Sequence, residues 1–175
     1  MASILNVDQI NNAAGTSGIT LDASTGKASF PNGATLPAGS VVQVVTSEST
    51  NNSGAISSAT YVAASGLTAS ITPSSTSSKI LVLVNSSVYG TSASTEGAYT
   101  IYRNGSDIGD ADGLSRSYTG ASDHIVPMSM HILDSPASSS SVTYAVYVKR
   151  TQGSGSLYTN LRGGKQSVTL MEIAQ

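Results

Sequence analysis

The only side chains that titrate near neutral pH are two histidines, His124 and His131. His124 follows Asp123 and lies close to several serines, so a Ser-His-Asp hydrolase site has to be considered. Serine accounts for 33 of the 175 residues, however, and no Gly-x-Ser-x-Gly nucleophile turn occurs. A serine near a histidine therefore carries little information. We expect no catalytic residues, with His124 in a loop and His131 half-buried in a strand.

Asp107, Asp110 and Asp112 form the densest group of acidic residues and are the weak candidates for a divalent cation. An EF-hand loop needs oxygen ligands at its first, third and fifth positions, then a glycine, and a glutamate at the twelfth. When Gly113 takes the glycine position, the first and twelfth positions hold an isoleucine and a threonine. We therefore expect a solvated loop, with no bound metal ion or other cofactor.

Tyrosine occurs eight times, and it can bury its ring while its hydroxyl stays in water. Four tyrosines fall at strand positions and are predicted to pack in the core or at an interface: Tyr99, Tyr102, Tyr144 and Tyr147. Tyr118 stands in the segment Arg-Ser-Tyr-Thr-Gly, where exposure is expected. Tyr118, Arg116 and His124 are therefore the candidate residues for recognition of another surface.

Charge and hydrophobicity exclude several classes of partner. Charged residues make up 10% of the chain and the formal net charge is −2, so neither nucleic acid nor an acidic lipid surface is an expected partner. The longest unbroken apolar run, residues 80–84, is far too short to span a bilayer, and the first residues lack the pattern of a signal peptide. With no cysteine and 39% hydrophobic residues, we expect a folded chain without disulfides or membrane insertion.

From Val41 onward the apolar residues alternate with period two, which predicts strands. The clearest stripe is Val142, Tyr144, Val146 and Val148, and weaker stripes include Val42 with Val44. Residues 80–84 are apolar throughout, which indicates a strand covered on both faces and hence an oligomer. Asn104-Gly105 predicts a two-residue hairpin turn. No window has a helical period, so residues 41–175 are predicted to be an all-β, jelly-roll-like two-sheet sandwich.

The first forty residues differ from the rest because their apolar side chains are sparse. Such a segment cannot bury enough surface to offset its own ordering entropy, so it is either disordered or lies against another chain. We expect an extended arm over residues 1–40 that docks on a partner either by adding a strand or by threading between subunits. Its candidate contact residues are Ile4, Leu5, Val7, Ile10, Ile19, Leu21 and Phe30.

Five segments carry a resemblance to known proteins: residues 3–10 (SILNVDQI), 18–33, 39–45 (GSVVQVV), 71–82 (ITPSSTSSKILV) and 168–175 (VTLMEIAQ). Together they resemble short β-rich virion proteins of tailed bacteriophages, in particular those of marine cyanobacterial phages. The segment 71–82 is the most specific. Residues from about 86 to 166 show no such resemblance.

The resemblance implies a non-enzymatic, tail-fibre-like structural protein located in the virion. It implies that residues 1–40 attach the chain to other virion proteins of the tail, neck or capsid, and that residues 41–175 form the head of a homotrimer. Two alternatives stay open. One is a capsid-decorating or head-fibre protein, and the other is a glycan-binding module whose loops contact a host-surface glycan.

Overall fold

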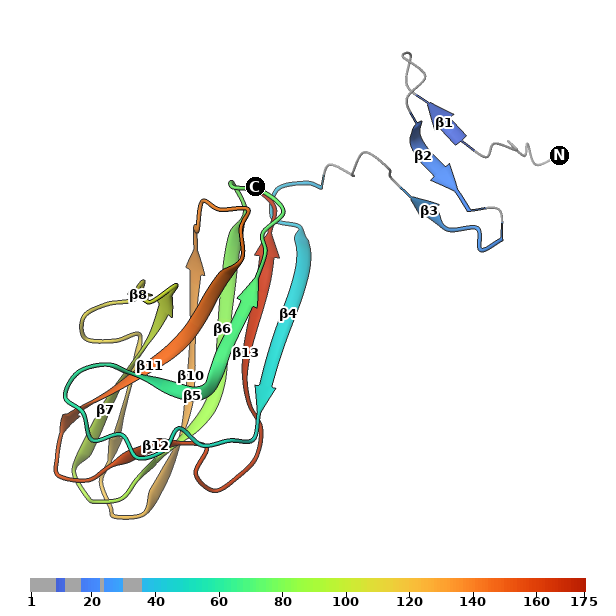
Figure 1. Cartoon of the computed structure of the whole chain (residues 1–175). Helices are drawn as coiled ribbons and strands as arrows, with labels where there is room; N and C mark the ends of the chain where they lie inside the picture. The colour runs from blue at the N-terminus through green and yellow to red at the C-terminus, as the bar shows by residue number, and fades with distance from the viewer. Residues whose placement is uncertain (1–8, 12–16, 23, 30–35) are drawn as a thin grey trace. The chain divides into compact units, whose positions relative to one another are not determined.

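The computed structural model describes residues 9–11, 17–22, 24–29 and 36–175. The chain divides into two compact units, Met1–Leu36 and Pro37–Gln175, which we call the N-terminal unit and the head (Figure 1). Every regular element in the described residues is a β-strand, which confirms the predicted all-β class. These residues accordingly contain no helix long and apolar enough to cross a membrane. The predicted arm residues Ile4, Leu5, Val7 and Phe30 lie outside the described part.

The N-terminal unit contains a small antiparallel sheet in the order β1-β2-β3, made of β1 (Gln9–Asn11), β2 (Ser17–Leu21) and β3 (Ala28–Ser29). Asp22 closes the turn between β2 and β3, because its Oδ1 accepts the backbone N–H groups of Ser24 at 2.9 Å and Thr25 at 2.7 Å. Over these residues the strands pair with one another, where the sequence led us to expect an extended arm. The predicted contact residues of this part stay exposed or half-buried: Ile10, Ile19 and Leu21.

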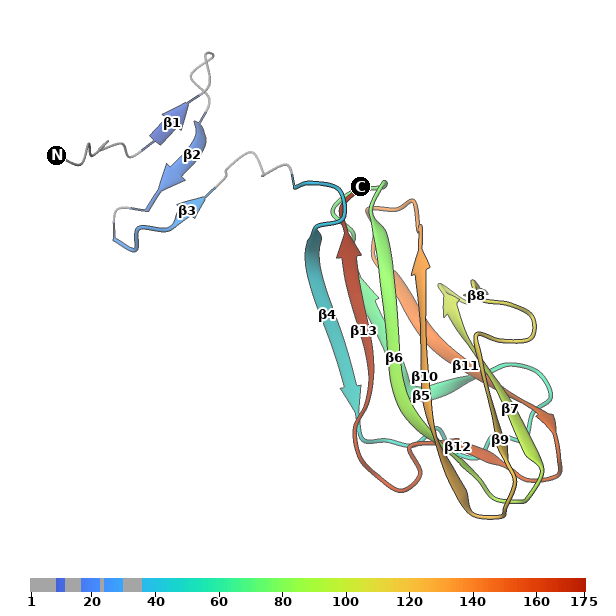
Figure 2. The ribbon, with the colours of Figure 1, turned by 180° about the vertical axis from the view of Figure 1, so that it is seen from behind.

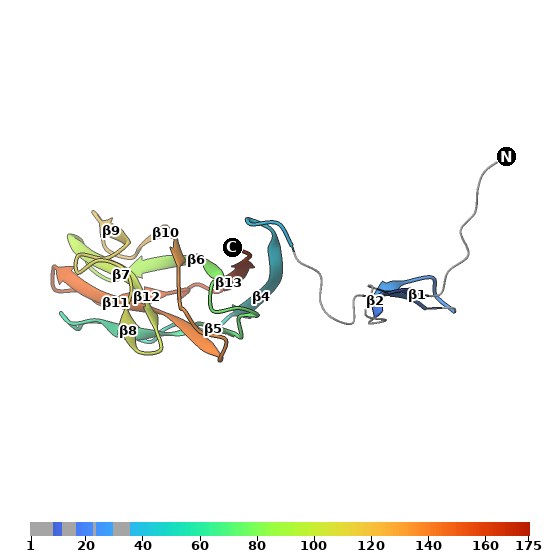
Figure 3. The same cartoon turned by 90° about the horizontal axis from the view of Figure 1, so that it is seen from above.

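The head consists of two antiparallel sheets packed face to face, and residues 36–175 are described without a gap (Figure 3). Sheet I has the order β10-β6-β13-β4, with β12 beside β6, and sheet II has the order β5-β11-β7-β8, with β9 beside β7. The strands are β4 (Val41–Ser49), β5 (Val62–Ile71), β6 (Lys79–Gly90), β7 (Thr95–Arg103), β8 (Ser106–Asp107), β9 (Ser115–Thr119), β10 (His124–Asp134), β11 (Val142–Gln152), β12 (Leu157–Thr159) and β13 (Gln166–Ile173).

The strand pairs follow a nested order. β4 pairs with β13, β5 with β11, β6 with β10, and β7 with β9, so the first four long strands of the head meet later strands in reverse sequence. The members of this series alternate between the two sheets, because β4 and β6 lie in sheet I while β5 and β7 lie in sheet II. Figure 2 shows β4, β13, β6 and β10 side by side in one layer.

The core lies between the two sheets and is built from alternate residues of the long strands. The predicted β11 stripe is confirmed, since Val142, Tyr144, Val146 and Val148 are at most 1% exposed. Facing residues come from both sheets: Leu67, Ile71, Ile80, Val82, Tyr99, Ile101, Met128, Val168 and Leu170. Alternation places each stripe on one face of its strand, so the opposite faces remain for other contacts.

The structure shows which faces of two sheet I strands point inward. On β4, Val44 is 54% exposed while Val45, one residue later, packs against the core. The segment 80–84 of β6 is covered by the head on one face, and its second apolar face is left for the partner chain that the sequence led us to expect. Val82 is fully buried, but Leu83 is 38% exposed. Both faces of β4 and β6 carry apolar side chains, so the local sequence pattern alone does not identify which face points inward.

The predicted hairpin turn is confirmed. Arg103 pairs with Ser106, and the two residues between them have positive φ angles, 49° for Asn104 and 86° for Gly105. Asn104 also exchanges two hydrogen bonds of 2.9 Å with the backbone of Thr143, which fastens the turn to β11. This hairpin sets the position of the acidic segment that follows β8.

A half-buried salt bridge joins the two sheets at one edge. Arg103 of sheet II donates from Nη1 to both carboxylate oxygens of Asp134 at 2.9 Å, and Asp134 ends β10 in sheet I. Tyr144 donates its hydroxyl to the same carboxylate at 2.7 Å. Burial and this carboxylate raise the pKa of Tyr144, so its hydroxyl remains a proton donor at neutral pH.

Glu172 on β13 is a fully buried carboxylate with four hydrogen bonds. Oε1 accepts the backbone N–H and the hydroxyl of Ser74, at 2.7 and 2.6 Å, and the hydroxyl of Ser78 at 2.7 Å. Oε2 accepts Nε2 of Gln43, on β4, at 2.6 Å. Burial raises the pKa of Glu172, but these hydrogen bonds outweigh it and hold the value at about 2. The carboxylate thus joins β4, β13 and the turn between β5 and β6.

We predict that Glu172→Ala lowers the free energy of unfolding by about 2–4 kcal/mol, because it leaves the buried hydroxyl of Ser78 unsatisfied and removes the hydrogen bonds that Ser74 and Gln43 donate to this carboxylate. Chemical denaturation measures this loss. The matched control is Glu48→Ala, which removes an exposed ion pair with Lys165 and should cost less than about 1 kcal/mol. Equal effects of the two substitutions would contradict a special role for Glu172.

The same carboxylate predicts a pH dependence. Its folded pKa is about 2 and its ordinary value is 4.5, so its stabilisation is complete above pH 4.5 and is lost as the pH falls towards 2. The melting temperature of the wild type should therefore fall across this window more steeply than that of Glu172→Gln, which cannot titrate there. Parallel melting curves for the two proteins would contradict the assignment.

Candidate functional site

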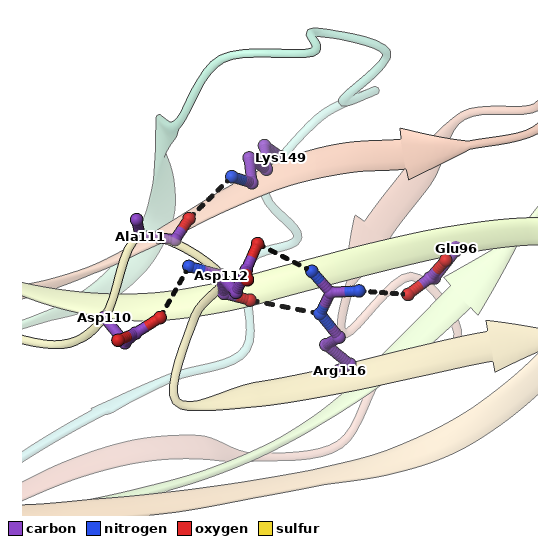
Figure 4. Close-up of polar contacts among 6 residues, drawn as sticks. All are labelled: Glu96, Asp110, Ala111, Asp112, Arg116 and Lys149. Atoms are coloured by element: carbon purple, nitrogen blue, oxygen red, sulfur yellow. Dashed lines mark hydrogen bonds and ion pairs between the residues drawn. The ribbon is translucent and has the colours of Figure 1, made fainter.

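The outer face of sheet II carries a network of charged groups centred on Arg116 of β9 (Figure 4). Its Nη1 donates to Oε1 of Glu96 at 2.9 Å, and its Nη2 donates to Oδ1 of Asp112 at 3.1 Å. Nε donates to the backbone oxygen of Asp112, also at 3.1 Å. Arg116 therefore joins β7 to the segment that runs from the last residue of β8 to the start of β9, residues 107–114, which we call the acidic loop. Its side chain is 45% exposed, so solvent screens these pairs.

The three aspartates of the acidic loop bind groups of their own chain. Oδ1 of Asp107 accepts the hydroxyl of Thr100 at 2.8 Å and the N–H of Gly109 at 2.9 Å. Oδ1 of Asp110 accepts the N–H of Asp112 at 2.9 Å. In the part of the chain that the structure describes, no group of three His, Cys, Asp or Glu side chains is arranged to hold a metal ion. Hydrogen bonds that the loop's backbone donates to its own aspartates, together with those from Arg116, thus hold the loop in this conformation.

Two of the predicted recognition residues lie together and the third does not. Arg116 and Tyr118 are two residues apart on the exposed face of β9, and Tyr118 is 54% exposed. The hydroxyl of Tyr118 donates to Oγ of Ser94 at 3.0 Å. His124 is also exposed, but it begins β10 and pairs with Gly90 in sheet I. The predicted trio therefore spans both sheets.

A cluster of tyrosines lies on the outer face of sheet II, and the sequence did not mark it as a site. The rings of Tyr102 and Tyr147 stack, with centroids 3.8 Å apart and an interplanar angle of 15°. Tyr61 meets the edge of Tyr102 at 6.2 Å, and Nζ of Lys149 lies 4.5 Å from the centre of the Tyr61 ring. The sequence did contain one indication of this cluster, because Tyr147 and Lys149 alternate with the inward-facing valines of β11 and must therefore face outward.

The outer face of sheet I has the opposite character. Leu133 opposes Leu81, Leu81 opposes Met171, and Met171 opposes Val44, which makes one apolar row across four strands. We call these four residues the apolar row. Leu133 is 52% exposed and Val44 is 54% exposed. Leu81 and Met171 between them are half-buried, and an apolar row of this kind on an outer face is typical of protein interfaces.

No model of a known protein family matches the chain, and no curated protein sequence matches it either. The geometry of the two outer faces and the resemblance of short segments are therefore the basis for assigning a function.

We predict that Arg116→Met loosens the acidic loop while the head stays folded. The free energy of unfolding should fall by less than about 1 kcal/mol, because the lost pairs are exposed. Backbone amides of Asp112 and Gly113 should exchange with deuterium at least several-fold faster, since Arg116 no longer binds Asp112. Lys165→Met, which breaks a surface pair elsewhere, is the control and should leave these amides unchanged. Unaltered exchange in Arg116→Met would show that the loop holds itself.

Proposed function

We propose that this chain is a non-enzymatic structural protein of a bacteriophage virion, of the tail-fibre-like kind. In this proposal the N-terminal unit attaches it to other virion proteins and the head contacts the host surface. The observation that carries the proposal is the contrast between the two outer faces of the head. Sheet I presents the apolar row, which suits packing against protein, while sheet II presents exposed Arg116, Tyr118 and the tyrosine cluster, which suit recognition.

The resemblance of separate segments to phage virion proteins gains support from their packing. The segment 71–82 contains Ser74 and Ser78, and the segment 168–175 contains Glu172, which accepts hydrogen bonds from both serines. The segment 39–45 contains Gln43, which donates to the same carboxylate. Three segments that resemble one family thus meet at one buried group, as expected when a shared packing requirement underlies the resemblance.

We infer that the head is a jelly roll. In a jelly roll a long antiparallel ribbon winds into two sheets, so early strands pair with late strands and successive strands alternate between the sheets. The nested pairs β4–β13, β5–β11, β6–β10 and β7–β9 support this topology.

The apolar row supports self-association of the head. Burial of exposed leucine, methionine and valine stabilises an interface by roughly 25 cal/mol per Å² of apolar surface. The row crosses all four strands of the β10-β6-β13-β4 layer, and β4 lies at its edge. A homotrimer is the stoichiometry that the resemblance implies, and the apolar row is the surface we assign to its contacts.

A capsid-decorating or head-fibre protein is the second candidate for the same architecture. It would also use a small attachment unit and an oligomeric head, so particle location separates the two. Labelled antibody against the head should mark the tail in electron micrographs of virions when the first proposal is right. Labelling spread over the capsid would replace it with the second.

We predict that deletion of residues 1–36 leaves a head that unfolds cooperatively, with a melting temperature within a few degrees of the full chain. The reason is that the core lies entirely between the sheets of the head. The truncated head should no longer copurify with particles, whereas residues 1–36 fused to an unrelated soluble protein should. A truncated head that still joins particles, or one that fails to fold, would contradict this division of roles.

We predict that Leu133→Lys combined with Met171→Lys converts the trimer into monomers, because it places two charges in the apolar row. Sedimentation velocity should report three times the chain mass for the wild type and one chain mass for the variant. Ile125→Lys changes an exposed residue of β10 outside the row and is the control. A monomeric wild type, or a variant that remains trimeric, would refute the assigned surface.

A further inference from the structure

The outer face of sheet II contains an open pocket of about 420 Å³. Its lining comes from five parts of the head, namely the stretch before β5, the strands β7, β8 and β11, and the acidic loop: Ala59, Thr60, Tyr61, Tyr102, Asp107, Ala111 and Lys149. This volume lies in the usual range for small-molecule sites. The pocket is separate from the ion pairs of Arg116, although the acidic loop contributes to both.

The aromatic part of the pocket is held rigidly. Tyr102 is fixed from one side by stacking on Tyr147 and from its edge by Tyr61. Lys149 places its ammonium group over the Tyr61 ring and donates a hydrogen bond of 2.8 Å to the backbone oxygen of Ala111. Two tyrosine rings therefore line the pocket in a defined arrangement, with little ordering left to be done when a ligand binds.

Polar groups with unused hydrogen-bonding capacity accompany these rings. The hydroxyl of Tyr61 is buried and has no hydrogen-bond partner among the described residues. Burial and the nearby Asp107 raise the pKa of Tyr61, so this hydroxyl keeps its proton at neutral pH. Among the described residues, Oδ2 of Asp107 takes part in no hydrogen bond, while Lys149 uses one of its three N–H groups. The ammonium group of Lys149 and the carboxylate of Asp107 thus border one aromatic surface, whereas the buried Tyr61 hydroxyl lies beside Gly113 of the acidic loop.

We propose that this pocket binds a neutral pyranose sugar of a host-surface glycan. A pyranose ring offers an apolar C–H face, which packs on a tyrosine ring, and hydroxyls at its rim, which exchange hydrogen bonds with a carboxylate and an ammonium group. Asp107 and Lys149 give the pocket lining one charge of each sign and no net charge, so a neutral sugar fits the pocket better than an ionic ligand. This assignment rests on the proposed role of the head in surface recognition and names the ligand class.

The test is titration of the full-length protein, followed by heteronuclear NMR, with three probes: methyl β-D-glucopyranoside, methyl β-D-galactopyranoside and N-acetylglucosamine. At least one should shift the backbone amides of Tyr61, Tyr102 and Ala111, with a Kd on the order of 1 mM, as a single shallow site would give. Tyr102→Ala should weaken this binding at least tenfold. Tyr158→Ala removes a tyrosine of β12 in sheet I, outside the pocket, and should leave binding within twofold.

Two further measurements keep the result decisive. Tyr102→Phe retains the stacked ring and should bind like the wild type, which separates loss of the aromatic surface from loss of folding. The second measurement is binding of a neutral envelope polysaccharide. If a glycan chain is the ligand, its Kd per sugar unit should be lower than that of the monosaccharides. If only a free sugar fits, the two Kd values should be equal.

Absence of amide shifts with all probes, or binding that survives Tyr102→Ala, would overturn the proposal. Copurification with particles does not depend on this outcome, so the two proposals fail separately.

Discussion

The buried carboxylate of Glu172 is the constraint on which the architecture of the head depends. A charged group out of contact with water is tolerated only when hydrogen bonds surround it, and here the donors come from β4 and from the turn between β5 and β6. Gln43 and Ser74 are far apart in sequence. The carboxylate on the last strand therefore joins the edge strand of sheet I to the crossover from sheet II into sheet I.

The two outer faces of the sandwich differ in chemistry. Alternate side chains of each strand fill the interior, and the other half of each strand faces outward. The outward half of sheet I includes the apolar row, whereas that of sheet II includes tyrosines with charged partners. Period-two alternation therefore gives one small domain two outer surfaces of different chemistry, which the proposed function assigns to assembly and to recognition.

The sequence predicted the parts of the fold that depend on local alternation or on turn chemistry. The β11 stripe and the Asn104-Gly105 turn belong to this group, since valine spacing and positive φ preference act over a few residues. The inward face of β4 does not follow from the sequence, because Val44 and Val45 are equally apolar and only the register with β13 decides between them. The tyrosine cluster depends on the pairing of β7 with β11 and on the distant Tyr61, which no local pattern contains. Of the recognition residues named from sequence, Arg116 and Tyr118 share a face because they are two residues apart on one strand.

The chain enters and leaves the head at the same end. Gly39 donates its N–H to the backbone oxygen of Ala174 at 2.8 Å, and Ala174 donates to Ser40 at 2.9 Å, just before β4 starts and just after β13 ends. The turns after β6 and β9 lie at the opposite end of the sandwich (Figure 1). When the head is gripped at that far end, tension transmitted through residues 37–40 runs along β4 and shears it against β13. In this shear geometry the hydrogen bonds between β4 and β13 must break together. The strand therefore resists a higher force than it would if the bonds broke one after another.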